Sequence, residues 1–307
     1  MFGAWGNPDE AECAAMVRRA LDAGITLFDC ADIYDRGRSE EILGAALAGV
    51  PRGSYVLATK CGNPMSDSDP SMRGLSAAWI ERACEDSMRR LGVEYLDLYQ
   101  AHRPDPSTPL EESLVAFDRL VEAGKVGAVG TSCFTAEQLD ELARLAGRSG
   151  LVAPATEQPP YSILARGIEV DIVPACARHD MALLVWAPLN GGWLTGKYQS
   201  GAGEGGSRAQ REPDHFDHAD AAMRDRKRSL VADLIGVASG AGMTITQLAL
   251  GFVLANAHVA AALIGPRTLV QLDDLLAAGA PELSADVLDA IDAIVPPGTN
   301  VNPKDAG

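Results

Sequence analysis

Short apolar runs that each end in an ionisable side chain are the feature that most constrains how this chain can fold. Three such runs in the first third of the chain end at Asp29, Lys60 and His102, and helix-like stretches separate them. Strands that alternate with helices form parallel sheet, in which the carboxyl ends of the strands lie on one face. We therefore expect the carboxylate, the amine and the imidazole to converge at one mouth. Tyr34, in a polar loop shortly after Asp29, is a fourth candidate.

Helix start and stop signals divide the rest of the chain into regular segments. Asn7 followed by Pro8 predicts a cap and a first helical residue, and Thr108 and Thr135 each begin a capping-box pattern. The alternation of strand and helix continues through the second half. There the predicted strands cover residues 153–157, 182–186 and 260–264, and the predicted helices cover residues 170–178, 227–239, 245–255, 268–277 and 284–294.

The number of strands that precede helices indicates the fold class. An α/β fold of the (β/α)8 TIM-barrel type has eight parallel strands, each followed by a helix. We predict this barrel with only seven of the eight strands evident, because no strand candidate precedes Asn7. We expect the eighth strand to lie before Met1, which would then be internal to a longer reading frame, and the barrel to have an unpaired edge. The seven strands end near Asp29, Lys60, His102, Thr131, Gln158, Trp186 and Ile264.

The chain is predicted to form one barrel domain over residues 1–307, because no linker-like stretch divides it. α/β barrels of this length are common as single domains. Residues 190–226 are rich in glycine and charge and lack clean periodicity, which predicts a long loop over the barrel mouth. Residues 296–307 are predicted to form an irregular C-terminal tail.

Charge and cysteine usage argue against several classes of function. The formal net charge is −16 and no basic stripe occurs, which argues against nucleic acid or an anionic membrane as partner. The six cysteines are spread singly, so neither a disulfide framework nor a metal site is indicated. We expect neither a signal peptide nor a membrane span. The sequence therefore predicts a soluble cytoplasmic protein, in keeping with a reducing compartment, and leaves the oligomeric state open.

Motifs spread in order along nearly the whole chain resemble those of the aldo-keto reductases. The stretch Gly24–Tyr34, which contains Asp29, is similar to the family's first signature, and Leu98–Asp105 resembles its histidine motif. The style of the motifs is similar to the bacterial branch allied to potassium-channel β subunits. The further matching segments are residues 39–44, 58–60, 129–132, 157–161, 186–189 with 192 and 196–198, and 264–268 with 271–272.

The resemblance implies that Asp29, Tyr34, Lys60 and His102 form a catalytic tetrad for carbonyl reduction. Hydride transfer to a carbonyl forms an alkoxide, which needs a proton, and a phenol with a pKa of about 10 is a poor acid at neutral pH. An ammonium beside the phenol favours phenolate, so Lys60 is expected to lower the pKa of Tyr34. Asp29 would hold Lys60 charged and in place. His102 would orient the carbonyl oxygen and share in the acid role.

The resemblance also implies NADPH as the hydride donor. The guanidinium of Arg267 suits a 2′-phosphate, and Thr268 opens a helix whose N-terminus favours the same group. No G-x-G-x-x-G motif follows a strand, so a Rossmann mode of binding is unsupported. The implied contacts are Ser132 and Gln158 at the nicotinamide carboxamide, Trp186 stacked on its ring, Arg267 and Thr268 at the 2′-phosphate and Gln271 near the adenine, with Pro188, Leu189, Gly265 and Asp274 completing the cofactor-binding set.

Two departures from the family pattern bear on the affinity for the cofactor. Cys133 stands where the family often has an asparagine beside the serine, which removes one amide contact to the carboxamide. Leu275 stands where an asparagine usually follows the acid of the last cofactor motif. Both departures affect the expected affinity more than the expected identity.

The leading interpretation is NADPH-dependent reduction of a small aldehyde or ketone to an alcohol. One alternative is a regulatory NADPH-binding module of the same fold with little turnover, and another is an N-terminally truncated inactive reductase. A third alternative is a lyase that forms a Schiff base on Lys60. Asp29 near the amine favours instead a charged lysine that is not nucleophilic.

Overall fold

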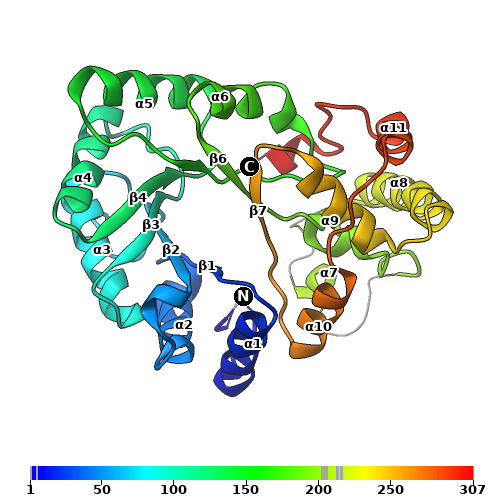
Figure 1. The fold of residues 1–307 in the computed structure, drawn as a ribbon, viewed down its shortest axis with the longest axis horizontal. Coiled ribbons are helices and arrows are strands. Elements are labelled where there is room, and N and C mark those ends of the chain that lie inside the picture. Colours follow the sequence, from blue (N-terminus) through cyan, green and yellow to red (C-terminus); the bar gives the residue numbers. More distant parts are fainter. Residues whose placement is uncertain (1, 5, 202–206, 212–213, 215–216, 307) are drawn as a thin grey trace. The chain divides into compact units, whose positions relative to one another are not determined.

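The computed structural model describes residues 2–4, 6–201, 207–211, 214 and 217–306, in which parallel strands alternate with helices (Figure 1). The chain divides into two compact units. Unit 1 comprises Met1–Glu157, His179–Met181 and Gly265–Leu276; unit 2 comprises Gln158–Arg178, Ala182–Ile264 and Ala277–Gly307. The seven strands of the described chain confirm the predicted fold class, an α/β fold of the (β/α)8 barrel type.

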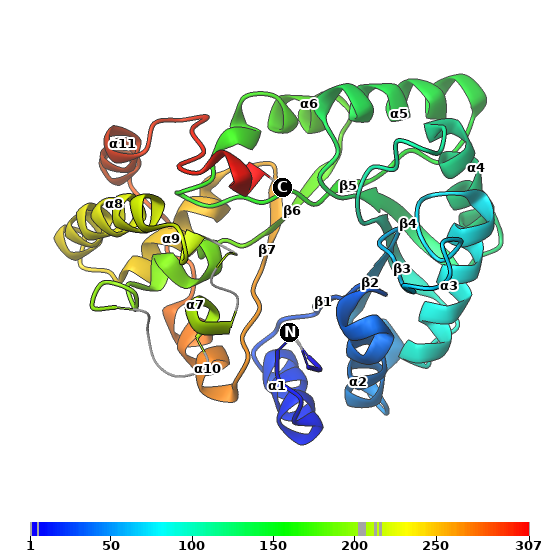
Figure 2. The same ribbon diagram turned by 180° about the vertical axis from the view of Figure 1, so that it is seen from behind.

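Unit 1 contains the first five strands, and each of the first four pairs in parallel with the next one along the chain. The strands are β1 (Leu27–Asp29), β2 (Val56–Cys61), β3 (Leu96–Ala101), β4 (Val126–Thr131) and β5 (Thr156–Glu157). Figures 1 and 2 show α3 and α4 covering one side of β2, β3 and β4. The helices are α1 (Glu10–Asp22), α2 (Arg38–Leu47), α3 (Ala77–Leu91), α4 (Leu110–Glu122), α5 (Ala136–Ser149) and most of α10 (Leu269–Ala278).

Unit 2 contains β6 (Ala182–Trp186) and β7 (Val259–Leu263), which pair in parallel with a register shift after Leu183. Helix α8 packs against both α9 and α11. The helices of this unit are α6 (Ile172–Arg178), α7 (Arg208–Arg211), α8 (Ala221–Gly240), α9 (Ile245–Ala255) and α11 (Ala285–Ile294). No single helix among the described residues is long and apolar enough to cross a membrane; α8 and α9 meet that test only as a pair, bent by 89°.

Two of the predicted helix caps differ from the structure. Helix α1 is capped by Asp9 instead of Asn7, because the Asp9 carboxylate accepts hydrogen bonds from the backbone of Ala11 and Glu12. The capping box predicted at Thr108 does not form, because its hydroxyl donates to the Asp105 carboxylate, 2.7 Å away, and Pro109 precedes the helix. The capping box at Thr135 is confirmed, with reciprocal bonds to Gln138.

The loop predicted over residues 190–226 is shorter and more structured than expected. It begins with a 3-10 helix, Asn190–Thr195, and helix α8 begins at Ala221, several residues before the predicted start at Lys227. The early start follows from Asp220, whose side chain accepts a hydrogen bond from the backbone of Met223. Residues 202–206, 212–213 and 215–216 of the predicted loop lie outside the described residues. The C-terminal tail is irregular as predicted, except for a short 3-10 helix, Pro303–Ala306.

The register of unit 1 brings the carboxyl ends of its strands to one edge. Asp29 pairs with Ala58 on β2, and Lys60 on that strand pairs with Gln100 on β3. The strand interiors are the core of the unit: from Leu57 onward every residue of β2 is buried. This alignment places the ends of the first three strands, at which we expect Asp29, Lys60 and His102 to converge, at the same edge.

Candidate active site

Lys60 and Asp29 form a buried ion pair at the carboxyl edge of unit 1. The Lys60 side chain is fully buried, and 10% of the Asp29 side chain is exposed. The Lys60 ammonium donates to one carboxylate oxygen of Asp29 and to the backbone oxygen of Cys30 at 2.7 Å. The predicted pairing of the acid with the amine is therefore present.

The charge state of Lys60 follows from two opposed effects. Burial alone would lower the pKa of this ammonium, but the neighbouring Asp29 and Tyr34 raise it to about 12. Lys60 therefore carries its charge throughout the neutral range. A lysine that stays protonated is a poor nucleophile, which disfavours the Schiff-base alternative.

The phenol of Tyr34 lies beside this ion pair. Lys60 Nζ is 5.3 Å from the centre of the Tyr34 ring. Burial raises the pKa of Tyr34 above its ordinary value, and the Lys60 ammonium offsets only part of that rise. Lys60 therefore lowers the pKa of Tyr34 as expected, but desolvation of the phenolate is the larger effect, so the net shift is upward instead of downward.

His102 completes the group from the loop after β3. Its ring stands edge-on to the ring of Tyr34, with 5.6 Å between the ring centres. Burial, followed by the charges of Lys60 and Arg103, lowers the pKa of His102 to about 2, so the imidazole is neutral. Within the described part of the chain, Nδ1 of His102 is buried without a hydrogen-bond partner. A neutral imidazole can orient a carbonyl oxygen by a hydrogen bond, but it carries no extra proton to give away. Of the two roles expected of His102, orienting the carbonyl oxygen is therefore favoured over sharing in the acid role.

Gln100 is a residue of this site that sequence reasoning missed. Its side chain is fully buried and donates to the second carboxylate oxygen of Asp29 at 3.1 Å. Asp29 is therefore held on one oxygen by Lys60 and on the other by Gln100. A signal was present in the sequence, because Gln100 lies two residues before His102 and strand periodicity directs both side chains to one face.

Ser132 and Gln158, the positions expected at the carboxamide, are both buried and follow β4 and β5 respectively. The turn after Ser132 is unusual, because Cys133 has a φ of 58°. The fully buried carboxylate of Glu157 accepts hydrogen bonds from the Thr131 hydroxyl and from the backbone of Phe134. Burial raises the pKa of Glu157 to about 7 despite these bonds. Glu157, also missed by sequence reasoning, therefore fastens the turn that presents Ser132.

The residues expected at the 2′-phosphate lie together in unit 1 at the start of α10. The backbone N–H of Arg267 donates to the side-chain oxygen of Gln271 at 2.8 Å, and Arg267 Nε donates to the Gly6 oxygen at 3.2 Å. The Thr268 hydroxyl accepts from the backbone of Gln271 at 3.2 Å. A guanidinium next to a helix N-terminus is a suitable site for a phosphate group. Gly265 and Asp274 flank this group and are exposed.

Unit 2 holds the remaining cofactor positions, on the loop that leaves β6. Trp186 is half-buried at the end of the strand, Pro188 is buried and Leu189 is half-buried. Ala187 and Asn190 both have positive φ values, 56° and 44°, so the loop follows a strained path. A cavity of about 240 Å³ opens beside this loop, and its lining includes Tyr161, Trp186, Ala187, Asn190, Asp217 and Asp305.

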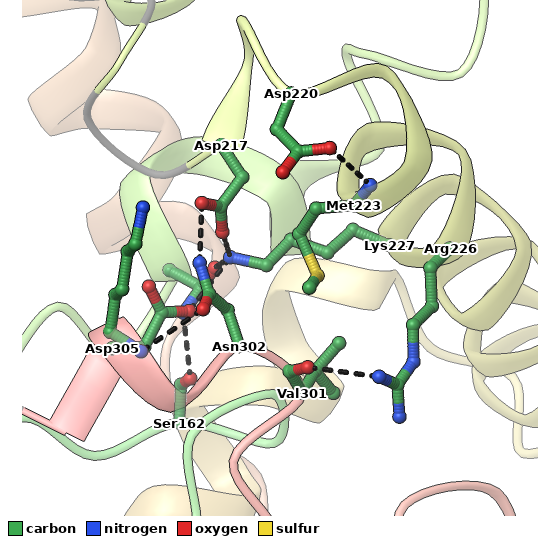
Figure 3. Close-up of polar contacts among 11 residues, drawn as sticks. Ser162, Asp217, Asp220, Met223, Arg226, Lys227, Val301, Asn302 and Asp305 are labelled. Carbon is green, nitrogen blue, oxygen red and sulfur yellow. Dashed lines mark hydrogen bonds and ion pairs between the residues drawn. The ribbon is translucent and has the colours of Figure 1, made fainter.

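A second fully buried lysine, Lys227 of α8, holds the β6 loop in place (Figure 3). Its ammonium donates to the side-chain oxygen of Asn190 at 2.9 Å and to Asp305 of the tail at 2.7 Å. It also forms an ion pair with Asp217 at 2.8 Å, and the other Asp217 oxygen accepts from Asn302. We call these five residues the Lys227 cluster. Sequence reasoning missed it, because its members come from four separate segments.

The donor set fits a pyridine nucleotide better than a metal ion. Among the described residues no three His, Cys, Asp or Glu side chains are grouped as they would be to hold a metal. In unit 1 the buried Ser132 hydroxyl suits an amide and the Arg267 guanidinium suits a phosphate; in unit 2 the buried side chain of Gln158 also suits an amide. The buried Nδ1 of His102 is a polar atom that a bound carbonyl compound could satisfy.

Known proteins resemble this chain over most of its length. The model of the aldo/keto reductase family matches residues 1–296. A probable voltage-gated potassium channel subunit beta of Arabidopsis thaliana is 34% identical over 96% of this chain and 92% of its own length. The uncharacterized oxidoreductase YrpG of Bacillus subtilis is 34% identical over 94% of this chain and 89% of its own. The aldo-keto reductase YhdN of the same bacterium is 38% identical over 63% of this chain and 56% of its own.

Proposed function

The chain belongs to the aldo/keto reductase family, and from this premise we propose that it reduces a small aldehyde or ketone to an alcohol with NADPH. Carbonyl reduction in general is supported by the family and by the oxidoreductase names of two relatives. The cofactor and the role of each tetrad residue are our proposal. The observation that carries it is the buried ion pair of Lys60 with Asp29 beside the phenol of Tyr34.

Each residue of the tetrad has a separate task in this proposal. Bound nicotinamide supplies the hydride. Tyr34 gives its proton to the oxygen of the substrate as negative charge develops there. Lys60 stabilises the phenolate that remains, and Asp29 keeps Lys60 charged and oriented. His102 donates a hydrogen bond from its neutral ring to the same oxygen.

The binding residues follow the same division. Ser132 and Gln158 would hold the carboxamide, and Trp186 would stack on the nicotinamide ring. Arg267 and Thr268 would hold the 2′-phosphate, with Gln271 near the adenine. The remaining cofactor positions, which border these groups in the sequence, are Pro188, Leu189, Gly265 and Asp274.

The proposal is tested by NADPH oxidation with a panel of small aldehydes, comparing wild type with Tyr34→Phe. We expect the variant to lose about 10²- to 10⁴-fold in kcat, the usual contribution of a general acid, while its Kd for NADPH is unchanged. Tyr95→Phe, which removes a hydroxyl from an exposed tyrosine, is the matched control and keeps full activity. Full turnover by Tyr34→Phe would refute the role of the phenol.

A specific observation favours the regulatory module as a second candidate. The raised pKa of Tyr34 makes it a weaker acid than the reductase mechanism prefers, and a related protein carries a potassium-channel β-subunit name. A module would bind NADPH and oxidise it at most once, slowly, per chain. A single-turnover experiment with excess aldehyde separates this outcome from steady-state reduction.

A further inference from the structure

We infer that Glu12 is a specificity-determining residue that makes the adenosine end of the cofactor site accept NADH as well as NADPH. The inference rests on the proposed function, because it concerns the same cofactor. It involves only residues of unit 1, from the start of α1 and the start of α10.

The carboxylate of Glu12 lies at the N-terminus of α10. One of its oxygens accepts a hydrogen bond from the backbone of Leu269, the first residue of that helix, at 2.9 Å. Its other oxygen accepts from the side-chain amide of Asn7 at 2.8 Å. Both carboxylate oxygens are thus fixed next to the segment that carries Arg267 and Thr268.

Asn7 ties this carboxylate to the phosphate-binding segment itself. The same side-chain nitrogen donates to the backbone oxygen of Arg267 at 2.8 Å. The Asn7 side-chain oxygen accepts from the backbone of Asp9 at 2.9 Å, so the amide is fixed at both ends. Asn7 is only 7% exposed, and Glu12 is half-buried. The position of Glu12 is therefore set by the fold and does not depend on a mobile surface side chain.

A carboxylate and a guanidinium at this place have opposite preferences. A guanidinium attracts the 2′-phosphate of NADPH, whereas a carboxylate repels it and accepts a hydrogen bond from the 2′-hydroxyl of NADH. A negative charge also opposes the attraction of a helix N-terminus for phosphate. The chain has both groups at one helix start: Arg267 precedes Leu269 by two residues, and Glu12 accepts the hydrogen bond from the backbone of Leu269. Their effects offset each other, which leaves the two cofactors with similar affinities.

Glu12→Gln tests the inference by removing the charge while keeping a side chain of the same size. The dissociation constants of NADPH and NADH are measured by quenching of intrinsic fluorescence, with no substrate present. For wild type we expect the two constants to differ by less than about tenfold. For the variant we expect NADPH to bind more tightly relative to NADH by a further factor of about five to ten, which is about 1 to 1.4 kcal/mol.

Glu10→Gln is the matched control. It removes one carboxylate from the first turn of the same helix, but Glu10 pairs with Arg38 instead of contacting α10. The ratio of the two constants should not change in this variant. If Glu12 only supported the local structure, Glu12→Gln would weaken both cofactors equally and the inference would be overturned, as it would if the ratio did not move.

A measurement on wild type alone keeps the inference testable if Glu12→Gln does not fold. Calorimetry with adenosine 2′,5′-bisphosphate and with ADP compares the two adenosine ends without nicotinamide. Affinities within about tenfold support the inference, and a preference above about a hundredfold for the bisphosphate overturns it. If wild type binds neither NADPH nor NADH, the proposed function fails and this inference with it. Binding of NADPH with an unmoved ratio overturns this inference alone.

Discussion

Each of the two units buries one lysine completely, and the two differ in what the ammonium contacts. Lys60 in unit 1 pairs with one carboxylate, that of Asp29, and lies beside the phenol of Tyr34. Lys227 in unit 2 donates to one carboxylate and one amide oxygen and forms an ion pair with a second carboxylate, all three held by the fold (Figure 3). Burial of a lysine therefore does not by itself mark a catalytic residue.

The two sites differ in whether a group next to the ammonium can lose a proton during a reaction. Around Lys227 the ammonium joins segments that are distant in sequence: Asn190 after β6, Asp217 before α8 and Asp305 in the tail. The ammonium donates to Asn190 and Asp305 and forms an ion pair with Asp217, so it serves as a fixed junction. Around Lys60 a neighbouring group is a phenol that can lose a proton, and the energy of that step depends on the ammonium. The first arrangement stabilises structure, and the second suits chemistry.

The largest effect on this comparison is expected for Lys227→Met, which should lower the free energy of unfolding. The substitution leaves two buried carboxylates without their cation, and breaking a buried pair typically costs 3–5 kcal/mol, here expected at about 5. Chemical denaturation followed by circular dichroism measures the loss. Asp305→Asn is the control, because it leaves Lys227 with Asp217 as a neutral pair and should cost only about 1 kcal/mol. If both variants lost the same free energy of unfolding, the charge of Lys227 would not be what stabilises the Lys227 cluster.

A second prediction concerns Lys60→Met, whose main effect should be on catalysis. Loss of the ammonium removes the charge that stabilises the phenolate of Tyr34, and we expect kcat to fall by about 10³-fold. The Kd for NADPH should change by less than about threefold, because Lys60 contacts none of the proposed cofactor residues that we describe. Lys60→Arg keeps the charge with a different shape and should recover part of the rate. Turnover within tenfold of wild type in Lys60→Met would contradict the catalytic role assigned to this lysine.

The sequence predicted the site of Lys60 because its residues obey short-range rules. Asp29 ends β1, Lys60 lies near the end of β2 and His102 follows β3, and parallel strands bring such positions together. The direction of the Tyr34 pKa shift could not be predicted in the same way. It depends on how completely the phenol is buried, and burial is a property of the packed fold.

The site of Lys227 could not be predicted, because its partners are far along the chain. Asn190 and Asp305 lie 37 and 78 residues from Lys227. No periodic pattern links these positions, and a lysine near a helix start is ordinarily a solvated residue. The same reason explains why Glu12 was missed: its contact with Leu269 spans 257 residues. The strand order and fold class, in contrast, follow from local alternation and were predicted correctly.

The smallest predicted effect is a difference in the pH dependence of stability between a carboxyl group near Lys60 and one near Lys227. Near Lys60, burial and then the charge of Glu40 raise the pKa of Asp32 to about 8, although Arg90 and Lys60 oppose the rise. Near Lys227, burial would raise the pKa of Asp217, but its bonds to Lys227 and Asn302 lower it overall. Asp32 is fully buried, and within the described chain its carboxylate oxygens have no side-chain partner.

These opposite shifts predict opposite pH dependences of stability. Asp32 has a folded pKa above its unfolded value near 4, so its contribution is complete below about pH 4 and is lost as the pH rises towards 8. Asp217 has a depressed folded pKa, so its contribution is present above its unfolded value and is lost only in more acidic solution. Asp32→Asn should therefore reduce the fall in the free energy of unfolding between pH 5 and 7 by about 1 kcal/mol per pH unit, measured by urea denaturation. Asp67→Asn, at an exposed carboxylate, should leave that slope unchanged. If the slope is the same in Asp32→Asn and wild type, Asp32 is already ionised in the folded protein, and the contrast between the carboxyl groups near the two lysines does not hold.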